Sequence, residues 1–180
     1  MELLGNEIYL RYYEDGDAQQ RLEFYMRNRQ FFDLYSTTRD VNFYTLPFHE
    51  EAIRSMRASE EQDEDYVFGI FFKKSHRLIG TISLTDIIRG PIQAAWVGYS
   101  IDKAENGRGI ATQALQLVTV HAFWDLKLHR LEAGVMPHNA ASIRVLEKVG
   151  YEREGLMRKN VSINGRWEDH YHYAIINPND

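Results

Sequence analysis

A glycine-rich turn between a strand-like and a helix-like segment constrains this chain most. Residues 96–102 alternate as a strand, Asn106-Gly107-Arg108-Gly109 forms the turn, and the residues after it have helical spacing to about Trp124. Glycine permits positive φ and close approach to a ligand, and the first N–H groups of a helix have no acceptor within it. The turn is therefore expected to bind an anion such as a phosphate or pyrophosphate.

Several kinds of phosphate loop can be compared with this turn. A Walker loop requires Gly-Lys followed by Ser or Thr, but Ile110 follows Gly109 here. A dinucleotide-binding loop requires a third glycine or alanine where Thr112 stands, and belongs early in a βαβ unit. An acyl-coenzyme A (CoA) pyrophosphate loop fits, and a glycine turn that merely ends a strand also remains open.

The segments around the turn predict an α+β fold with a mixed, mostly antiparallel sheet flanked by helices. Three strands joined by short turns, over 66–73, 77–88 and 93–101, predict an antiparallel meander. Asn164-Gly165 predicts a type I′ hairpin between two further strands. The remaining strands are expected over 8–13 and 129–135, with the hairpin strands over 151–161 and 167–176, and helices over 18–28, 31–35, 47–59 and 139–149. The acidic run 60–65 is interpreted as a solvated loop, and residues 1–180 as one domain without linkers or repeats.

Composition excludes several classes of function. The 180 residues contain no cysteine, so disulfides, cysteine-ligated zinc and a thiol nucleophile are excluded, and any sulfur chemistry must come from a cofactor. No apolar run is long enough to span a membrane, and the N-terminus lacks a signal-peptide pattern, so a cytoplasmic protein is expected. The net charge of −5 argues against a broad nucleic-acid-binding face and is compatible with a cationic substrate such as an amine.

A second motif begins at Asn139 and continues as a helix to Val149, followed by Gly150-Tyr151. Asn139 and Ser142 are three residues apart and therefore share a face at the start of this helix. Because asparagine is a preferred N-cap, a purely structural role for this pair also stays open.

Together the two motifs resemble the GNAT superfamily of N-acetyltransferases. Residues 107–112 resemble its cofactor loop, Gln/Arg-x-x-Gly-x-Gly/Ala, and residues 139–151 resemble its Asn-x-x-Ser/Ala…Gly-Phe/Tyr helix. Gly98-Tyr99, Glu154-Gly155 and Asn164-Gly165 are similar to the branch that acetylates the N-termini of ribosomal proteins. The similarity covers nearly the whole chain, with Leu3 to Arg11 matching the first strand; Asn106 departs from the Gln or Arg of the wider family.

The resemblance implies acetyl transfer from acetyl-CoA to a primary amine, most simply a protein N-terminus, by direct attack in a ternary complex. It implies that the pantetheine arm runs between the strand ending near Ile101 and the strand over 129–135, with a backbone N–H near Tyr99 holding the thioester carbonyl. The implied cofactor-binding residues are Tyr99, Ser100, Ile101, Gly107, Arg108, Gly109, Ile110, Ala111, Thr112, Asn139, Ser142 and Lys148. The implied catalytic residues are Ser142, Asn139 and Glu132. No metal is expected. The resemblance also implies a homodimer or higher homo-oligomer.

The roles of these catalytic residues follow from the same resemblance. Leu146 stands where many family members have a tyrosine, so Ser142 is the expected proton donor to the departing thiolate, as in the ribosomal-protein branch. An α-amine, with a pKa of about 7.7–8.0, is deprotonated by a weaker base than a lysine amine, whose pKa is about 10.4. The candidate bases are Glu132, Glu154, Glu168, Asp169 and His138, of which Glu132 is favoured because its strand borders the expected cleft.

Two other readings of the site remain open. His170 and His172 share a face of a strand and suggest a metal site only if a third ligand joins them. The function itself has two alternatives: acetylation of a polyamine or aminoglycoside, or a non-catalytic CoA-binding module with this fold.

Overall fold

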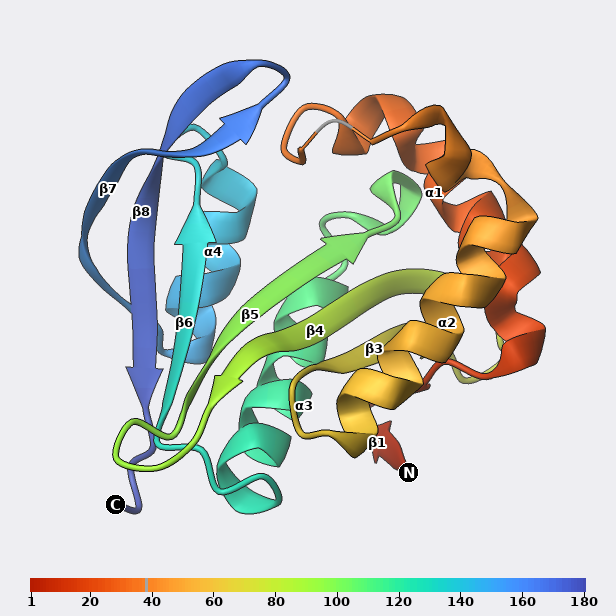
Figure 1. Cartoon of the computed structure of the whole chain (residues 1–180). Helices are drawn as coiled ribbons and strands as arrows, with labels where there is room; N and C mark the ends of the chain where they lie inside the picture. Colours follow the sequence, from red (N-terminus) through yellow and green to blue (C-terminus); the bar gives the residue numbers. More distant parts are fainter. Residues whose placement is uncertain (38) are drawn as a thin grey trace.

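In the described part of the chain, eight strands form one sheet in the order β1-β2-β3-β4-β5-β6-β8-β7 (Figure 1). The computed structural model describes residues 1–37 and 39–180. Every neighbouring pair is antiparallel except β5 and β6, which run parallel. The strands are β1 (Glu2–Leu4), β2 (Ile8–Tyr12), β3 (Tyr66–Phe72), β4 (Leu78–Ile88), β5 (Ala94–Ile101), β6 (Arg130–Val135), β7 (Glu152–Ile163) and β8 (Arg166–Ile176). The predicted α+β fold with a mixed, mostly antiparallel sheet is confirmed.

Among the described residues, four α-helices cover the two faces of the sheet (Figure 1). Alternation along β2 divides the core, because Ile8 and Leu10 join one apolar cluster while Tyr9 joins the other. The first cluster includes Leu115 of α3, and the second includes Phe24 of α1. The helices are α1 (Ala18–Phe32), α2 (Leu46–Glu61), α3 (Ile110–Trp124) and α4 (Ala140–Val149), with short 3-10 helices at Asp15–Asp17, Val41–Tyr44 and Lys103–Glu105. Helices α1 and α2 therefore lie on the face opposite α3.

The N-terminal part differs from the sequence prediction in three places. The separate helix expected over 31–35 is wrong: α1 continues to Phe32, because no Gly or Pro interrupts it and Phe32 is buried against Phe24. The strand expected over 8–13 is preceded by a short strand, β1, which pairs with it as a hairpin. The acidic run 60–65 is not all loop, since its first two residues complete α2 and Asp63 pairs with Arg89 at 2.6 Å.

The C-terminal hairpin forms as the sequence predicts. Asn164 and Gly165 have φ values of 51° and 76°, which is the positive sign that a type I′ turn requires at both positions. Within the described part of the chain, no helix is both long and apolar enough to cross a membrane.

Candidate active site

The parallel strands β5 and β6 pair over only part of their length. Their register runs from Ala94↔Arg130 to Trp96↔Glu132 and ends there, although β5 continues to Ile101 and β6 to Val135. Beyond Trp96 the two strands diverge, and the backbone groups of β5 that face away from β4 have no strand to pair with. The sheet therefore contains a V-shaped opening lined by main-chain donors and acceptors.

The N-terminus of α3 borders this opening. Gly107 and Gly109 have φ values of 79° and 76°, a region that glycine occupies without strain, so the chain turns sharply from β5 into α3. Gly109 is the N-cap and offers no side chain to the first amides, and the first bond of the helix is donated by the Gln113 amide to the Gly109 carbonyl. The N–H groups of residues 110–112 are thus available to an anion.

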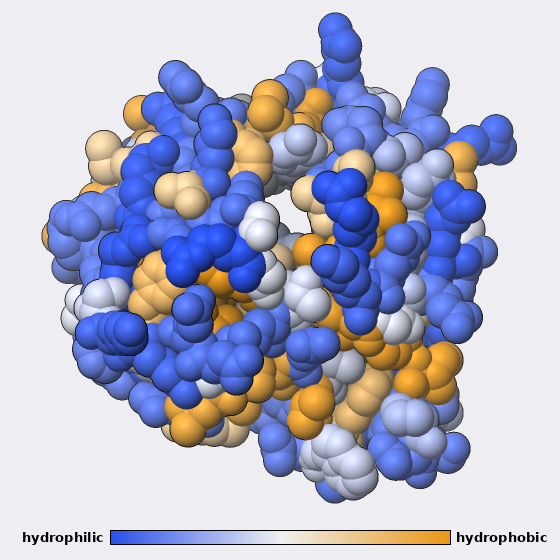
Figure 2. Space-filling model, turned by 180° about the vertical axis from the view of Figure 1, so that it is seen from behind, coloured by the Kyte–Doolittle hydropathy of each residue, from blue (hydrophilic) through white to orange (hydrophobic). Residues whose placement is uncertain are grey.

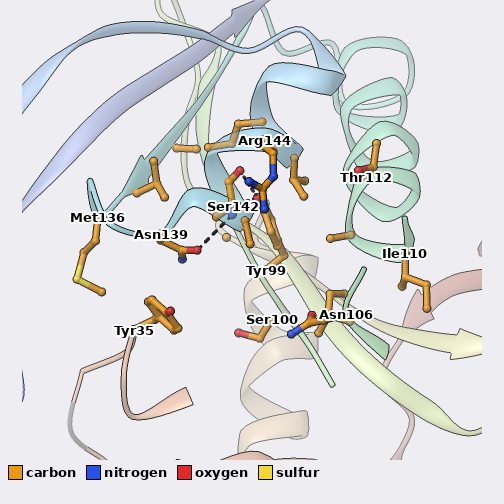
Figure 3. Close-up of a pocket in the computed structure, with 18 of the residues that line it drawn as sticks. Tyr35, Tyr99, Ser100, Asn106, Ile110, Thr112, Met136, Asn139, Ser142 and Arg144 are labelled. Atoms are coloured by element: carbon orange, nitrogen blue, oxygen red, sulfur yellow. Dashed lines mark hydrogen bonds between the residues drawn. The ribbon is translucent and has the colours of Figure 1, made fainter. Parts of the chain in front are cut away.

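A hydroxyl group from α4 lies between the two strands. Asn139 caps α4 by accepting from the Ser142 amide at 3.2 Å, and the Ser142 hydroxyl lies 2.8 Å from the Tyr99 hydroxyl on β5 (Figure 3). Burial raises the pKa of Tyr99 to about 12, while its bond to Ser142 acts in the other direction. Both hydroxyls are therefore neutral near pH 7, and each can donate or accept a hydrogen bond.

These features line one cavity of about 540 Å³. Its walls come from both faces of the sheet, because α3 and α4 contribute on one side and Phe31, Phe32 and Tyr35, at the end of α1, contribute on the other. Figure 3 shows Ser142 and Tyr99 between Tyr35 and Met136 at one end and Ile110 and Thr112 at the other. The space-filling view shows an opening near the centre of the molecule, between two halves of the surface (Figure 2).

Most of the residues expected to form the site line this cavity. They are Tyr99, Ser100, Ile101, Gly107, Gly109, Ile110, Ala111, Thr112, Asn139, Ser142 and Lys148. Over the described residues, Arg108 and Glu132 are the two that do not. The Arg108 guanidinium instead binds Glu105 at 2.5 Å and Glu7 at 3.4 Å, so its charge is engaged by carboxylates of the protein.

Glu132 lies at the last β5–β6 pair, within a charged cluster. Its Oε1 accepts from Arg130 at 2.5 Å and its Oε2 lies 3.2 Å from His172 Nε2. Arg130 also binds Glu154 and, by that hydrogen bond, lowers the pKa of Glu154. Both Glu132 oxygens are thus already engaged by neighbouring side chains, outside the set of residues that line the cavity.

The other four candidate bases are also outside the cavity lining among the described residues. Glu154 is held by Arg130, and Asp169 accepts from the Lys159 amide at 2.8 Å. His138 is exposed, with its ring 6.1 Å from that of Tyr35.

His170 does line the cavity, a position that the sequence did not suggest. Its Nδ1 lies 2.9 Å from the side-chain amide of Asn160, and that amide is best oriented with its nitrogen toward the Glu168 and Met157 carbonyls. In that orientation Asn160 donates to Nδ1, which also lies 3.4 Å from the Glu168 carbonyl, so this ring nitrogen is engaged within the protein. No group of three or more possible metal ligands occurs in the part of the chain that the structure describes.

Sequence reasoning also missed the side chain of Tyr99, which was expected to contribute only its backbone. Alternation along β5 was the available signal: Val97, Tyr99 and Ile101 share the face that packs against the α3 cluster. That the Tyr99 hydroxyl reaches Ser142 depends on where α4 packs, which no local pattern encodes.

Comparisons with known proteins identify this arrangement. Residues 7–152 match the model of the acetyltransferase (GNAT) domain. A probable N-acetyltransferase, YjcK of Bacillus subtilis, is 51% identical over 99% of this chain and 98% of its own length. A solved ribosomal-protein-S5-alanine acetyltransferase from Vibrio fischeri has a TM-score of 0.95 and 30% identity over 99% of this chain and 97% of that one. Mycobacterium smegmatis RimJ, solved with CoA-disulfide, has a TM-score of 0.89 and 26% identity over 94% of this chain and 81% of that one.

The glycine turn, the parted strands and the α4 hydroxyl thus occur in a chain whose relatives transfer acetyl groups. The chain belongs to the GNAT family of acetyltransferases, enzymes that take the acetyl group from acetyl-CoA.

Proposed function

We propose that this enzyme acetylates the α-amine of a protein N-terminus, of the kind found on ribosomal proteins. The observation that carries the proposal is the V-shaped opening beyond the Trp96↔Glu132 pair, with free helix amides on one side and the Ser142 hydroxyl beside it. The relatives named for ribosomal-protein S5 alanine acetylation and RimJ support the choice of acceptor.

The residues present fit acetyl-CoA, which supplies the acetyl thioester. The amides of residues 110–112 would hold the pyrophosphate, with Lys148 contributing charge from α4. The unpaired backbone of β5 from Val97 to Ile101 would bind the pantetheine arm and polarise the thioester carbonyl.

Ser142 would donate a hydrogen bond or proton to the departing sulfur. Tyr99 supports it at 2.8 Å, and Asn139 fixes the first turn of α4 through the Ser142 amide. A thiol has an ordinary pKa of about 8.5, so its thiolate is a weak base that a hydrogen bond from a neutral hydroxyl is enough to stabilise until solvent supplies the proton. The acceptor α-amine titrates at about 7.7–8.0 and can lose its proton to water without a strong base. We therefore assign Glu132 a positioning role, through Arg130 and His172, in place of the expected role as base.

Charge favours a peptide over a polyamine or an aminoglycoside. Among the described residues that line the cavity, the carboxylate is Glu105, which is bound by both Arg77 and Arg108. A polycation would need carboxylates that are not already neutralised.

Mass spectrometry of reactions with acetyl-CoA tests the acceptor. We expect acetylation of peptides with a free α-amine and none of the same peptides with a blocked N-terminus and an internal lysine. Ser142→Ala should lower kcat about a hundredfold while the protein still binds acetyl-CoA, since general acid–base groups contribute roughly 10²–10⁴-fold. Acetylation of spermidine or an aminoglycoside but of no peptide would favour a small-amine acetyltransferase instead. Binding of acetyl-CoA without acetylation of any amine would indicate a non-catalytic module.

Three further expectations belong to this proposal. One catalytic domain over 1–180 is supported by the single sheet that starts at Glu2 and ends at Ile176. A cytoplasmic location is supported by an acceptor made on the ribosome. A homodimer is supported by exposed apolar side chains on the hairpin, where Trp167 is 63% and Leu156 is 49% exposed, and sedimentation measurements would test it.

A further inference from the structure

Over residues 1–37 and 39–180, five glycines lie inside strands, where glycine is unfavourable and needs a reason. The surrounding protein supplies a reason for three of them. A Cβ on Gly69 would lie 2.5 Å from Phe71, and one on Gly80 would lie 2.9 Å from the Ser100 carbonyl, so packing forbids a side chain there. Gly155 lies at a register shift of the edge strand β7, where a bulge accounts for it.

Gly98 and Gly134 have no such reason. A Cβ on Gly98 would meet only Ser83 at 3.9 Å, and one on Gly134 would meet Met157 at 3.5 Å and His170 at 3.8 Å, all ordinary contacts. Neither glycine has the positive φ that would exclude other residues. The lack of a side chain at Gly98 and Gly134 therefore leaves room for a ligand that is not part of the folded chain.

The two glycines occupy matching positions. The register that pairs Ala94 with Arg130 and Trp96 with Glu132 would, if continued, set Gly98 opposite Gly134. They are thus the first residues past the last β5–β6 pair on that face of the sheet, one on each arm of the V. Both are exposed, and both line the cavity.

This face is the one from which the amine must approach. Ser142 lies on the opposite face, bonded to Tyr99, which alternates with Gly98 along β5. The departing sulfur would lie next to Ser142, so the attacking nitrogen enters from the side of Gly98 and Gly134. The α-carbon of the acceptor, which follows the nitrogen by one bond, must then pass between these two residues.

We propose that Gly98 and Gly134 form an aperture that determines acceptor specificity, keeping room for a nitrogen on a substituted carbon. The inference rests on the proposed function. A terminal lysine amine is attached to an unbranched CH₂ and would pass a narrower opening, whereas a peptide α-amine brings a side chain and a carbonyl with it. The aperture therefore selects acceptors that begin with a small side chain on the α-carbon.

The test pairs a methyl group on the enzyme with a methyl group on the substrate. Wild type, Gly134→Ala and Gly98→Ala are assayed on two peptides that differ only in starting with Gly or Ala. We expect each variant to lower kcat/KM for the Ala peptide at least about tenfold more than for the Gly peptide, as one methyl group does in a tight pocket. Gly155→Ala, the same change in an edge strand away from the cavity, should leave the ratio unchanged.

Each outcome distinguishes the inference from the proposed function. Equal losses on both peptides, or no loss, with unchanged acetyl-CoA binding by calorimetry, would overturn the aperture while leaving N-terminal acetylation intact. If one variant does not fold, the other decides alone, because the two substitutions have different neighbours. No turnover by wild type on either peptide would overturn the proposed function, and the aperture with it.

Discussion

The sheet is closed on its β2–β4 side and open between β5 and β6. On the closed side α1 and α2 bury aromatic side chains such as Phe24 and Phe71, and β3 is paired on both edges, with one register shift against β4 at Ile70/Phe71. On the open side the strand pairing ends at Trp96↔Glu132, and main-chain groups and two bare glycines face the cavity. Substitutions on the closed side should therefore change the free energy of unfolding and leave the rate of acetyl transfer unchanged. Substitutions on the open side should change the rate of acetyl transfer and have little effect on stability.

The largest effect is expected at His49, in the closed half. Burial, and next the Arg21 guanidinium that donates to Nδ1 at 2.5 Å, lower the pKa of His49 to about 4. The unfolded chain, with an ordinary pKa near 6.5, takes up the proton first as the pH falls, so the native state loses up to about 3 kcal/mol between roughly pH 6.5 and 4. Urea unfolding from pH 7.5 to 4 should show this loss in wild type.

His49→Gln, which keeps an acceptor for Arg21, serves as the comparison. The difference in unfolding free energy between wild type and variant should change with pH in that window and stay constant above about pH 7. A constant difference throughout would mean that the His49 ring is not held neutral in the fold.

A smaller loss is expected from Gly69→Ala in β3. The new Cβ would lie 2.5 Å from the Phe71 ring and 3.1 Å from Leu78, so the core must shift, at about 2 kcal/mol. Gly134→Ala adds the same methyl group where the neighbours are at 3.5 Å or more and should cost less than about 0.5 kcal/mol. Denaturant midpoints of the two variants measure this difference in stability. Equal losses would refute the distinction between the closed and open sides of the sheet.

What the sequence could predict follows the same division. The glycine turn, the meander and the Asn164-Gly165 hairpin are set by local backbone chemistry, so residues close in the chain sufficed. The Tyr99–Ser142 contact and the pairing of Glu132 with His172 join residues 43 and 40 positions apart, and no local pattern encodes them. Even α1 was divided wrongly, because the burial of Phe32 is decided by its packing against Phe24, which no local pattern encodes.

In the open half, Tyr99→Phe should have a modest effect on catalysis. Removing the hydroxyl deletes the 2.8 Å bond to Ser142, worth about 1 kcal/mol, or roughly fivefold in kcat. Because the pKa of Tyr99 is about 12, the pH profile of wild type and variant should have the same shape below about pH 10. A hundredfold loss, comparable with that of Ser142→Ala, would indicate that Tyr99 itself delivers the proton to the thiolate.

The smallest effect is expected from Glu132→Gln, where the structure and the sequence hypothesis diverge most. Glutamine keeps the shape and an acceptor for Arg130 or His172, and the pairs that it weakens are partly exposed, so less than about 1 kcal/mol should be lost. We expect a fall in kcat/KM of less than about fivefold, with the ascending limb of the pH–rate profile unmoved, because that limb reports the acceptor amine. If the fall reached a hundredfold and the limb shifted with the acceptor held constant, Glu132 would be the general base after all. The cavity would then have to extend past Trp96, into the part of the sheet where the strands are paired.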